Sequence, residues 1–197
     1  MKKTICITGM DGTGKSTLIK SLASIYPSCY TATIWDLMTS ENKGLPFNSK
    51  KDIDDFLCGL TPDSRLLFLA HAMKYSIDMA LKSDKEVIII DSYYFKYFAM
   101  EKALGADEEL MKSLLKSFPV PDIVLELILP IDIAFERKQN YSKYECGMQS
   151  DPKHFKTFQL KVFDAWEMFD RDGAWHMLNA RNGSDEVLAE ASKYLEI

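Results

Sequence analysis

A glycine-rich stretch near the N-terminus constrains this chain more than any other segment. Residues 9–17 read Gly-Met-Asp-Gly-Thr-Gly-Lys-Ser-Thr, after the apolar, β-branched run 4–8 and before apolar residues at helical spacing. A strand, a glycine-rich turn and a helix that begins at Lys-Ser match the Walker A pattern, G-x-x-x-x-G-K-[ST], in the context that this pattern requires. The stretch therefore predicts that the chain binds a nucleoside triphosphate.

Phosphate chemistry explains the residue types in this stretch. Glycines let the backbone turn its N–H groups toward a phosphate, and the helix N-terminus adds a partial positive charge. Lys15 supplies a mobile cation for the outer phosphates and is predicted to be catalytic, while the Ser16 hydroxyl can hold Mg²⁺. The residues of the stretch that we expect to bind ATP are Gly9, Met10, Asp11, Gly12, Thr13, Gly14, Lys15, Ser16 and Thr17.

Composition favours a soluble enzyme of one domain spanning residues 1–197. A chain of 197 residues can bury a sizeable core, and its net charge of −5 gives no field for gripping a nucleic-acid backbone. The four cysteines lie far apart, without metal-ligand spacing, and no apolar run is long enough to span a membrane. The predicted strand begins too early to leave room for a signal peptide. We therefore expect a cytoplasmic protein with neither nucleic-acid nor membrane partners.

The order of apolar segments predicts a parallel α/β fold. Uninterrupted apolar runs at 87–90 and 123–129 are typical of strands that are covered on both faces of a parallel sheet. Further strands are expected at 29–35 and 175–178, and helical patterns alternate with all of them. This alternation predicts helices on both faces of the sheet, with ligands at the carboxyl ends of the strands.

Asp91 stands at the carboxyl end of the predicted strand 87–90, on the edge where the phosphates must lie. A carboxylate there would bind Mg²⁺, directly or through water, or would orient the attacking hydroxyl, so Asp91 is predicted to be catalytic and a metal ligand. The alternative is a helix N-cap, and one residue can serve both purposes.

The polar segment 139–151 lies between two predicted helices and is interpreted as a lid. Phosphoryl transfer requires a mobile flap that excludes water and brings cations to the transferred group. Arg137, Lys138 and Lys143 lie in or beside this segment. The alternative is a solvated charged loop.

Several motifs in order along the chain resemble the thymidylate kinase family of P-loop nucleoside monophosphate kinases. Residues 9–17 match the family pattern G-x-[DE]-G-x-G-K-[ST]-T, and 66–72, Leu-Leu-Phe-Leu-Ala-His-Ala, are similar to its L-L-F-A-A-x-R helix. Residues 91–93, Asp-Ser-Tyr, resemble its D-R-Y. The resemblance implies a nucleoside monophosphate kinase fold: a five-stranded parallel sheet with the strand after the first helix at an edge.

The same resemblance continues through the C-terminal half. Residues 134–137, Ala-Phe-Glu-Arg, are similar to the A-x-x-R helix of the family, and 143–147, Lys-Tyr-Glu-Cys-Gly, resemble its R-Y-E-x-G lid. Residues 178–180, Leu-Asn-Ala, resemble the adenine-side I-D-A. The resemblance implies ATP and Mg²⁺ as cofactors, dTMP as acceptor, a homodimer, ATP contacts from Arg137 and Ala180, a catalytic role for Lys143, and contact of Asp11 with a sugar hydroxyl.

The acceptor side departs from the family pattern by losing arginines. Ser92 replaces the arginine that grips the acceptor phosphate, and Ala72 replaces the base-reading arginine. The R-E-P arginine of the family has no counterpart, and Ile34-Trp35-Asp36 stands in that region. Each bidentate, charge-assisted contact to a phosphate is worth about 1.5–3 kcal/mol. We therefore expect a rebuilt acceptor site in which Lys96 or Lys74 substitutes, and weak activity on dTMP. The residues expected to contact the acceptor are Asp11, Trp35, Phe68, His71, Tyr75, Tyr93, Lys96 and Tyr144.

Three functions remain open at this point. The first is transfer of the ATP γ-phosphoryl group to a dTMP-like nucleoside monophosphate. The second is a kinase that acts on a modified nucleotide, a nucleoside or another small hydroxylated metabolite. The third is a nucleotide-binding regulatory module without transfer chemistry, against which the presence of Lys15, Ser16 and Asp91 argues.

Overall fold

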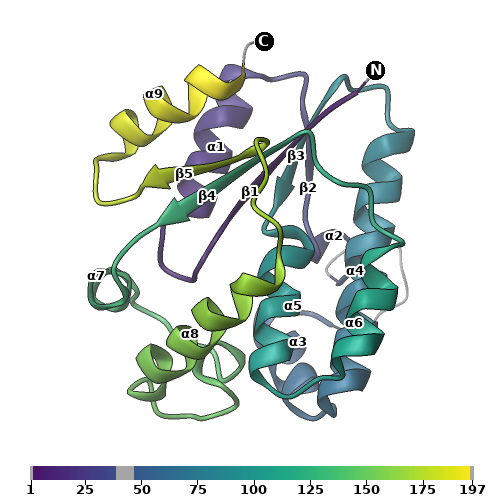
Figure 1. Cartoon of the computed structure of the whole chain (residues 1–197), viewed down its shortest axis with the longest axis vertical. Coiled ribbons are helices and arrows are strands. Elements are labelled where there is room, and N and C mark those ends of the chain that lie inside the picture. The colour runs from purple at the N-terminus through teal and green to yellow at the C-terminus, as the bar shows by residue number, and fades with distance from the viewer. Residues whose placement is uncertain (1, 39–46, 196–197) are drawn as a thin grey trace.

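A five-stranded parallel sheet forms the middle layer of the protein, as a computed structural model that describes residues 2–38 and 47–195 shows (Figure 1). Its strand order is β2-β3-β1-β4-β5, so the strand after the first helix lies at an edge, as predicted. The strands are β1 (Lys3–Gly9), β2 (Tyr30–Ala32), β3 (Val87–Asp91), β4 (Ile123–Ile128) and β5 (Trp175–Asn179).

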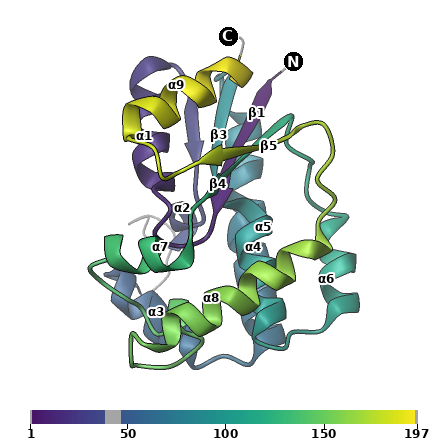
Figure 2. The ribbon, with the colours of Figure 1, turned by 60° about the vertical axis from the view of Figure 1, so that its left-hand side comes forward.

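Helices cover both faces of this sheet (Figures 1 and 2). Helices α1 and α9 pack on one face, and α4 and α5 pack on the other, where α8 lies against α5. The helices are α1 (Lys15–Ile25), α2 (Trp35–Met38), α3 (Lys50–Cys58), α4 (Pro62–Lys82), α5 (Tyr93–Ala103), α6 (Glu108–Leu115), α7 (Ile131–Arg137), α8 (His154–Ala165) and α9 (Ser184–Leu195), with 3₁₀ turns η1 (Tyr144–Cys146) and η2 (Trp166–Met168).

The central strand β1 is buried on both faces because successive side chains of a strand point to opposite sides. Ile5 and Ile7 belong to the apolar cluster beneath α1 and α9, whereas Cys6 belongs to the cluster beneath α4 and α5. The predicted fold class is therefore confirmed, and its physical basis is the continuous apolar run that a doubly covered parallel strand requires.

The predicted strand at 29–35 is shorter in the structure. β2 ends at Ala32, and the helix α2 begins at Trp35. The carboxylate of Asp36 accepts a hydrogen bond from the backbone N–H of Thr33 at 3.1 Å, which turns the chain out of the sheet. Residues 39–46, which make up most of the polar stretch 39–50, lie outside the described residues.

The register of the sheet brings the predicted functional segments to one edge. Ile7 of β1 lies opposite Asp91 of β3, and Gly9 lies opposite Leu127 of β4. The glycine-rich turn therefore leaves β1 beside the carboxyl ends of both neighbouring strands. Among the described residues, no helix is both long and apolar enough to cross a membrane.

Candidate active site

A cavity of about 690 Å³ opens at this carboxyl edge, between the glycine-rich turn, α5, α7 and the turn after β5. It brings together most of the residues that the sequence assigned to ATP and metal binding. The predicted residues that line it are Asp11, Gly12, Thr13, Gly14, Lys15, Ser16, Thr17, Trp35, Asp91, Lys96, Arg137 and Ala180.

Two glycines of the turn are required by close approach of neighbouring backbone. Gly9 has φ +133°, and a Cβ there would lie 2.6 Å from the carbonyl oxygen of Leu127. Gly12 has φ +84°, and a Cβ there would lie 2.6 Å from the carbonyl oxygen of Ala134. A side chain at either position would push the turn away from β4 or α7 and change the curvature that binds phosphate.

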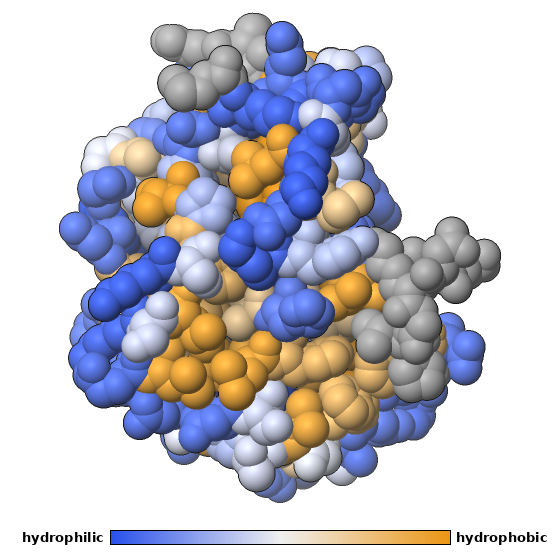
Figure 3. Space-filling model, turned by 90° about the vertical axis from the view of Figure 1, so that its right-hand side faces the viewer, coloured by the Kyte–Doolittle hydropathy of each residue, from blue (hydrophilic) through white to orange (hydrophobic). Residues whose placement is uncertain are grey.

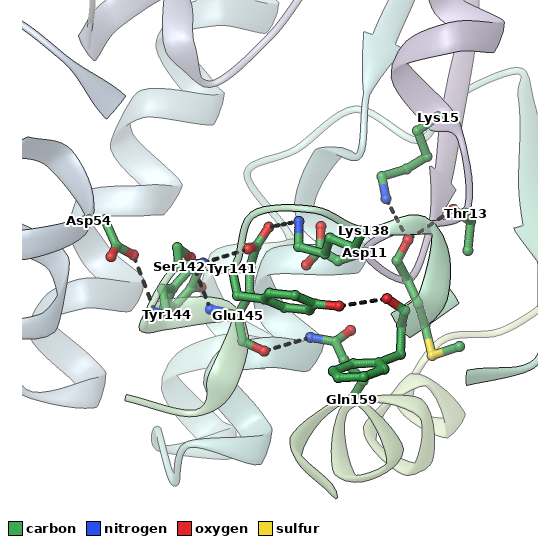
Figure 4. Close-up of polar contacts among 12 residues, drawn as sticks. Asp11, Thr13, Lys15, Asp54, Lys138, Tyr141, Ser142, Tyr144, Glu145 and Gln159 are labelled. Atoms are coloured by element: carbon green, nitrogen blue, oxygen red, sulfur yellow. Dashed lines mark hydrogen bonds and ion pairs between the residues drawn. The ribbon is translucent and has the colours of Figure 1, made fainter. Parts of the chain in front are cut away.

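Lys15 is buried and folds back over its own loop. Its ammonium donates to the carbonyl oxygen of Gly9 at 3.0 Å. It also donates to the Met10 carbonyl at 2.6 Å, and the Thr13 hydroxyl donates to the same carbonyl (Figure 4). Burial and then the nearby charge of Lys96 lower the pKa of Lys15 to about 8. Repulsion between the ammonium groups of Lys15 and Lys96 costs free energy. A bound polyphosphate would offset this cost, because its negative charge attracts both groups.

Asp11 lies at the centre of the cationic part of the cavity. Its Oδ1 accepts from the Lys96 ammonium at 2.6 Å. Burial alone would raise the pKa of Asp11, but the charges of Lys96, Lys15 and Lys138 outweigh burial and lower it to about 2. Within the described part of the chain its second oxygen, Oδ2, is buried without a hydrogen-bond partner. A bound molecule with a donor group would satisfy that oxygen.

Asp91 faces the same cavity from the end of β3. Its Oδ1 accepts from the Ser92 hydroxyl at 2.9 Å, and Ser92, not Asp91, occupies the N-cap position of α5. Ser92 and Tyr93 have φ values of 64° and 51°, an uncommon backbone conformation for residues with side chains. Strain of this kind is concentrated at functional sites, where surrounding structure holds it in place.

Ser16 and Asp91 offer the oxygen donors that Mg²⁺ prefers. Both line the cavity, one with a hydroxyl and the other with a carboxylate. No group of three or more His, Cys, Asp or Glu side chains suited to a metal occurs among the described residues. The pair therefore fits an ion that takes its remaining ligands from nucleotide phosphates and water.

A second cavity of about 900 Å³ adjoins the first on the side of α2, α3 and the segment 139–151. Lys143 and Tyr144 line this cavity but not the first one. The residues that line both cavities are Trp35, Lys50, Lys96, Tyr97, Lys138 and Glu145. Of these, only Trp35 and Lys96 were assigned to the acceptor from the sequence.

Four other residues predicted to contact the acceptor line neither of these cavities of the described chain. Phe68 packs against Phe56, with ring centroids 5.1 Å apart, and His71 is exposed on α4. Tyr75 is half-buried against the apolar cluster beneath α4 and α5. Tyr93 is buried among aromatic rings, and its hydroxyl donates to the Pro119 carbonyl at 3.1 Å. Packing therefore accounts for Tyr93 without a ligand.

Sequence reasoning missed several cavity residues. The turn Asn182-Gly183-Ser184 and Val187 of α9 complete the wall near Ala180. An Asn-Gly pair between the last strand and the last helix was a readable signal for this turn. Arg137 donates to the Ala180 carbonyl at 2.7 Å and so joins α7 to the same wall.

The segment 139–151 is docked on α3 by hydrogen bonds. Asp54 of α3 accepts from the backbone N–H of Tyr144 at 3.2 Å (Figure 4). It also accepts from the backbone N–H of Lys143 at 3.2 Å. Glu145 accepts from the Lys138 ammonium at 2.9 Å and, through its carbonyl, from the Gln159 amide of α8 at 3.1 Å. These contacts close the segment over the second cavity.

A buried ionic network anchors the same segment to the helical layer. Glu101 of α5, 0% exposed, accepts from Arg65 of α4 at 2.8 and 3.0 Å and from the Tyr144 hydroxyl at 2.7 Å. Arg65 also donates to the carbonyl oxygens of Leu57 and Leu60 at the end of α3. One network thus joins α3, α4, α5 and the segment 139–151.

Replacing Glu101 with alanine is expected to destabilise the fold by about 3–5 kcal/mol, because it leaves the Arg65 charge buried without its partner. Urea unfolding measures this change. The matched control is Lys51→Ala, which breaks an exposed ion pair with Asp55 and should leave the stability close to that of wild type. A loss below about 1 kcal/mol for Glu101→Ala would mean that Arg65 finds other partners.

Comparisons with known proteins point to one family. The family model described as thymidylate kinase matches residues 7–191. A probable thymidylate kinase 1 of Saccharolobus solfataricus is 31% identical over 201 residues, which cover 100% of this chain and 98% of that protein. A probable thymidylate kinase of Sulfolobus acidocaldarius is 28% identical, covering 94% and 92%. The structure of thymidylate kinase from Candida albicans superposes with a TM-score of 0.73 at 17% identity, covering 99% of this chain and 91% of that one.

Proposed function

This chain belongs to the thymidylate kinase family, and from that premise we propose that it transfers the γ-phosphoryl group of ATP to a dTMP-like nucleoside monophosphate. The family assignment makes the chain a nucleotide kinase. The transfer to a nucleoside monophosphate is supported mainly by one observation: Lys96, Tyr97 and Lys138 line both cavities, so the two cavities meet at these residues. A donor in the first cavity and an acceptor in the second would meet there, as in-line transfer requires.

Donor binding falls to the glycine-rich turn. Its backbone N–H groups and the N-terminus of α1 would hold the donor phosphates. Lys15 would exchange the carbonyl oxygens of Gly9 and Met10 for phosphate oxygens and stabilise the charge that develops during transfer. Ser16 and Asp91 would hold Mg²⁺, which when bound neutralises phosphate charge. Arg137, Ala180 and the turn at Asn182 would border the adenine.

We assign the segment 139–151 the role of a lid over the acceptor. Its contacts with Asp54 and Glu101 position Tyr144 and Glu145 against the second cavity, and a closed segment there would exclude water from the transferred group. Because Lys143 lines only the second cavity, its predicted catalytic role requires the lid to move further toward the donor.

A coupled ADP-release assay on the wild-type protein tests the proposal. We expect turnover with dTMP that requires ATP and Mg²⁺, with kcat/KM at least about 100-fold below a typical enzyme value of 10⁵ M⁻¹s⁻¹, because the acceptor-side arginines of the family are missing. Other nucleoside monophosphates and thymidine complete the panel. Efficient turnover of thymidine but not of dTMP would favour a nucleoside kinase. Nucleotide binding without any turnover would favour a regulatory module.

We also propose a homodimer in the cytoplasm. The face of the molecule that carries α4 gathers apolar side chains in its lower half (Figure 3). Leu67 and Met79 of α4 are 49% and 42% exposed, so this helix offers apolar surface to a partner. The resemblance to the family supports a second copy of this chain as the partner that covers this face. Light scattering tests the proposal by measuring whether the molecular mass in solution is that of a dimer.

A further inference from the structure

The acceptor's phosphate needs a cation at the junction of the two cavities. Transfer requires an oxygen of that phosphate to face the γ-phosphoryl group, so the acceptor phosphate must lie where donor and acceptor cavities meet. The family pattern supplies an arginine at position 92, but this chain has Ser92, whose hydroxyl is bonded to Asp91. Another cationic side chain must therefore reach the same place.

Lys96 has the position that this role demands. It lies one helical turn after Ser92 on α5, and helical side chains lean toward the helix N-terminus, which is the end that carries Asp91 and Ser92. Its side chain is 13% exposed and lines both cavities. Asp11 holds its ammonium at 2.6 Å, which fixes the charge at the junction.

Lys96 also has unused hydrogen-bonding capacity. An ammonium carries three N–H donors, and Asp11 is the one hydrogen-bond acceptor that Lys96 has within residues 2–38 and 47–195. Burial would lower the pKa of Lys96, but Asp11 and the other acids around it, including Glu145, raise the pKa above its ordinary value. Lys96 is therefore charged at neutral pH and has two donors available to an anion.

The other cations near the junction are less suited to this role. Lys138 is paired with Glu145 at 2.9 Å, and Lys15 is committed to the donor loop. Lys50 is exposed, whereas Lys96 is half-buried at the junction. Both ammonium groups lie over aromatic rings, that of Lys50 5.1 Å from the Trp35 centroid and that of Lys96 5.5 Å from the Tyr97 centroid, so exposure is what separates them. Lys74, the other candidate from the sequence, pairs with Asp78 along α4 and lines neither cavity of the described chain.

We propose that Lys96 binds the phosphate of the acceptor nucleotide, in place of the arginine that the family carries at position 92. The inference rests on the proposed function and makes it more specific. A lysine presents a point charge, without the planar fork that grips two phosphate oxygens at once, so specificity for a monophosphate would depend on how firmly Asp11 holds the ammonium.

The test compares Lys96→Met and Lys96→Arg with wild type, in kinetics and in calorimetric binding of dTMP and thymidine. We expect Lys96→Met to raise the KM and Kd for dTMP about 10- to 100-fold, because one charge-assisted contact to phosphate is lost. The KM for ATP and the Kd for thymidine should stay within about threefold. Lys96→Arg should recover most of the dTMP affinity. The matched control is Lys102→Met, on the same helix but in a surface pair with Glu108.

Several outcomes separate this inference from its premise. Wild-type turnover of dTMP together with an unchanged KM for dTMP in Lys96→Met overturns the role of Lys96 and leaves the kinase assignment standing. Equal losses for dTMP and thymidine also overturn it, since they indicate that Lys96 only supports Asp11. A wild-type protein that neither binds nor phosphorylates any nucleoside monophosphate overturns both. If Lys96→Met does not fold, the double variant Asp11→Asn with Lys96→Met removes both charges, and it should still lose its preference for dTMP over thymidine.

Discussion

Replacing Lys15 with alanine is expected to lower turnover by about 10³-fold while leaving the fold intact. The ammonium is bonded only to loop carbonyls in the described structure, at Gly9 and Met10, so the apolar core loses nothing when it is removed. The Lys15 ammonium is predicted to bind the phosphates, and one cation there contributes several kcal/mol to stabilising the transition state. Burial disfavours the charged ammonium in the folded protein and lowers its pKa to about 8. An uncharged side chain at this position should therefore not lower the free energy of unfolding.

The ADP-release assay and thermal unfolding of Lys15→Ala measure the two parts of this expectation. Lys20→Ala, on the exposed side of the same helix, is the matched control and should behave as wild type. A folded Lys15→Ala variant that keeps more than about a tenth of wild-type turnover would show that the glycine-rich turn is not the catalytic centre.

Asp91→Asn is expected to lower turnover by about 10²-fold or more, with little change in melting temperature. The amide keeps the shape of the side chain and can still accept from the Ser92 hydroxyl, but it removes the charge that faces the phosphates. Within the described structure the Asp91 carboxylate accepts from the Ser92 hydroxyl and from no backbone N–H of α5, so the first turn of the helix does not depend on this carboxylate.

Ser92→Ala provides the companion measurement for Asp91. It removes the hydrogen bond to Asp91 and leaves the carboxylate in place, so its loss of turnover should be smaller than that of Asp91→Asn. If Asp91→Asn instead loses several degrees of stability and keeps its activity, the carboxylate is structural and the metal role fails.

Much of the fold followed from local patterns. The runs at 87–90 and 123–129 became β3 and β4 because a strand covered on both faces must be apolar throughout. The predicted strand at 29–35 was wrong in its second half, where Asp36 turns the chain into α2. A side-chain hydrogen bond to the backbone overrode the apolar pattern there.

The donor site was readable because it is contiguous. The glycines of residues 9–17 specify the turn locally, and β1, which comes directly before the turn, ends at the carboxyl edge of the sheet. Neither feature depends on residues far away in the chain. Asp91 could be added from its place at the end of a buried strand, since the carboxyl ends of parallel strands share one edge.

The acceptor site could not be read in this way, because it is assembled from segments far apart in the chain. Phe68, His71 and Tyr75 lie on the helix that the family pattern indicated, yet their side chains line neither cavity of the described structure. The sequence offered Lys96 and Lys74 as alternatives to the missing arginines, each on a predicted helix. The docking of α5 beside the glycine-rich turn, which brings Lys96 within 2.6 Å of Asp11, gives the structural reason to prefer Lys96. Periodicity specifies which residues share a helical face, but the packing of the helix decides what that face meets.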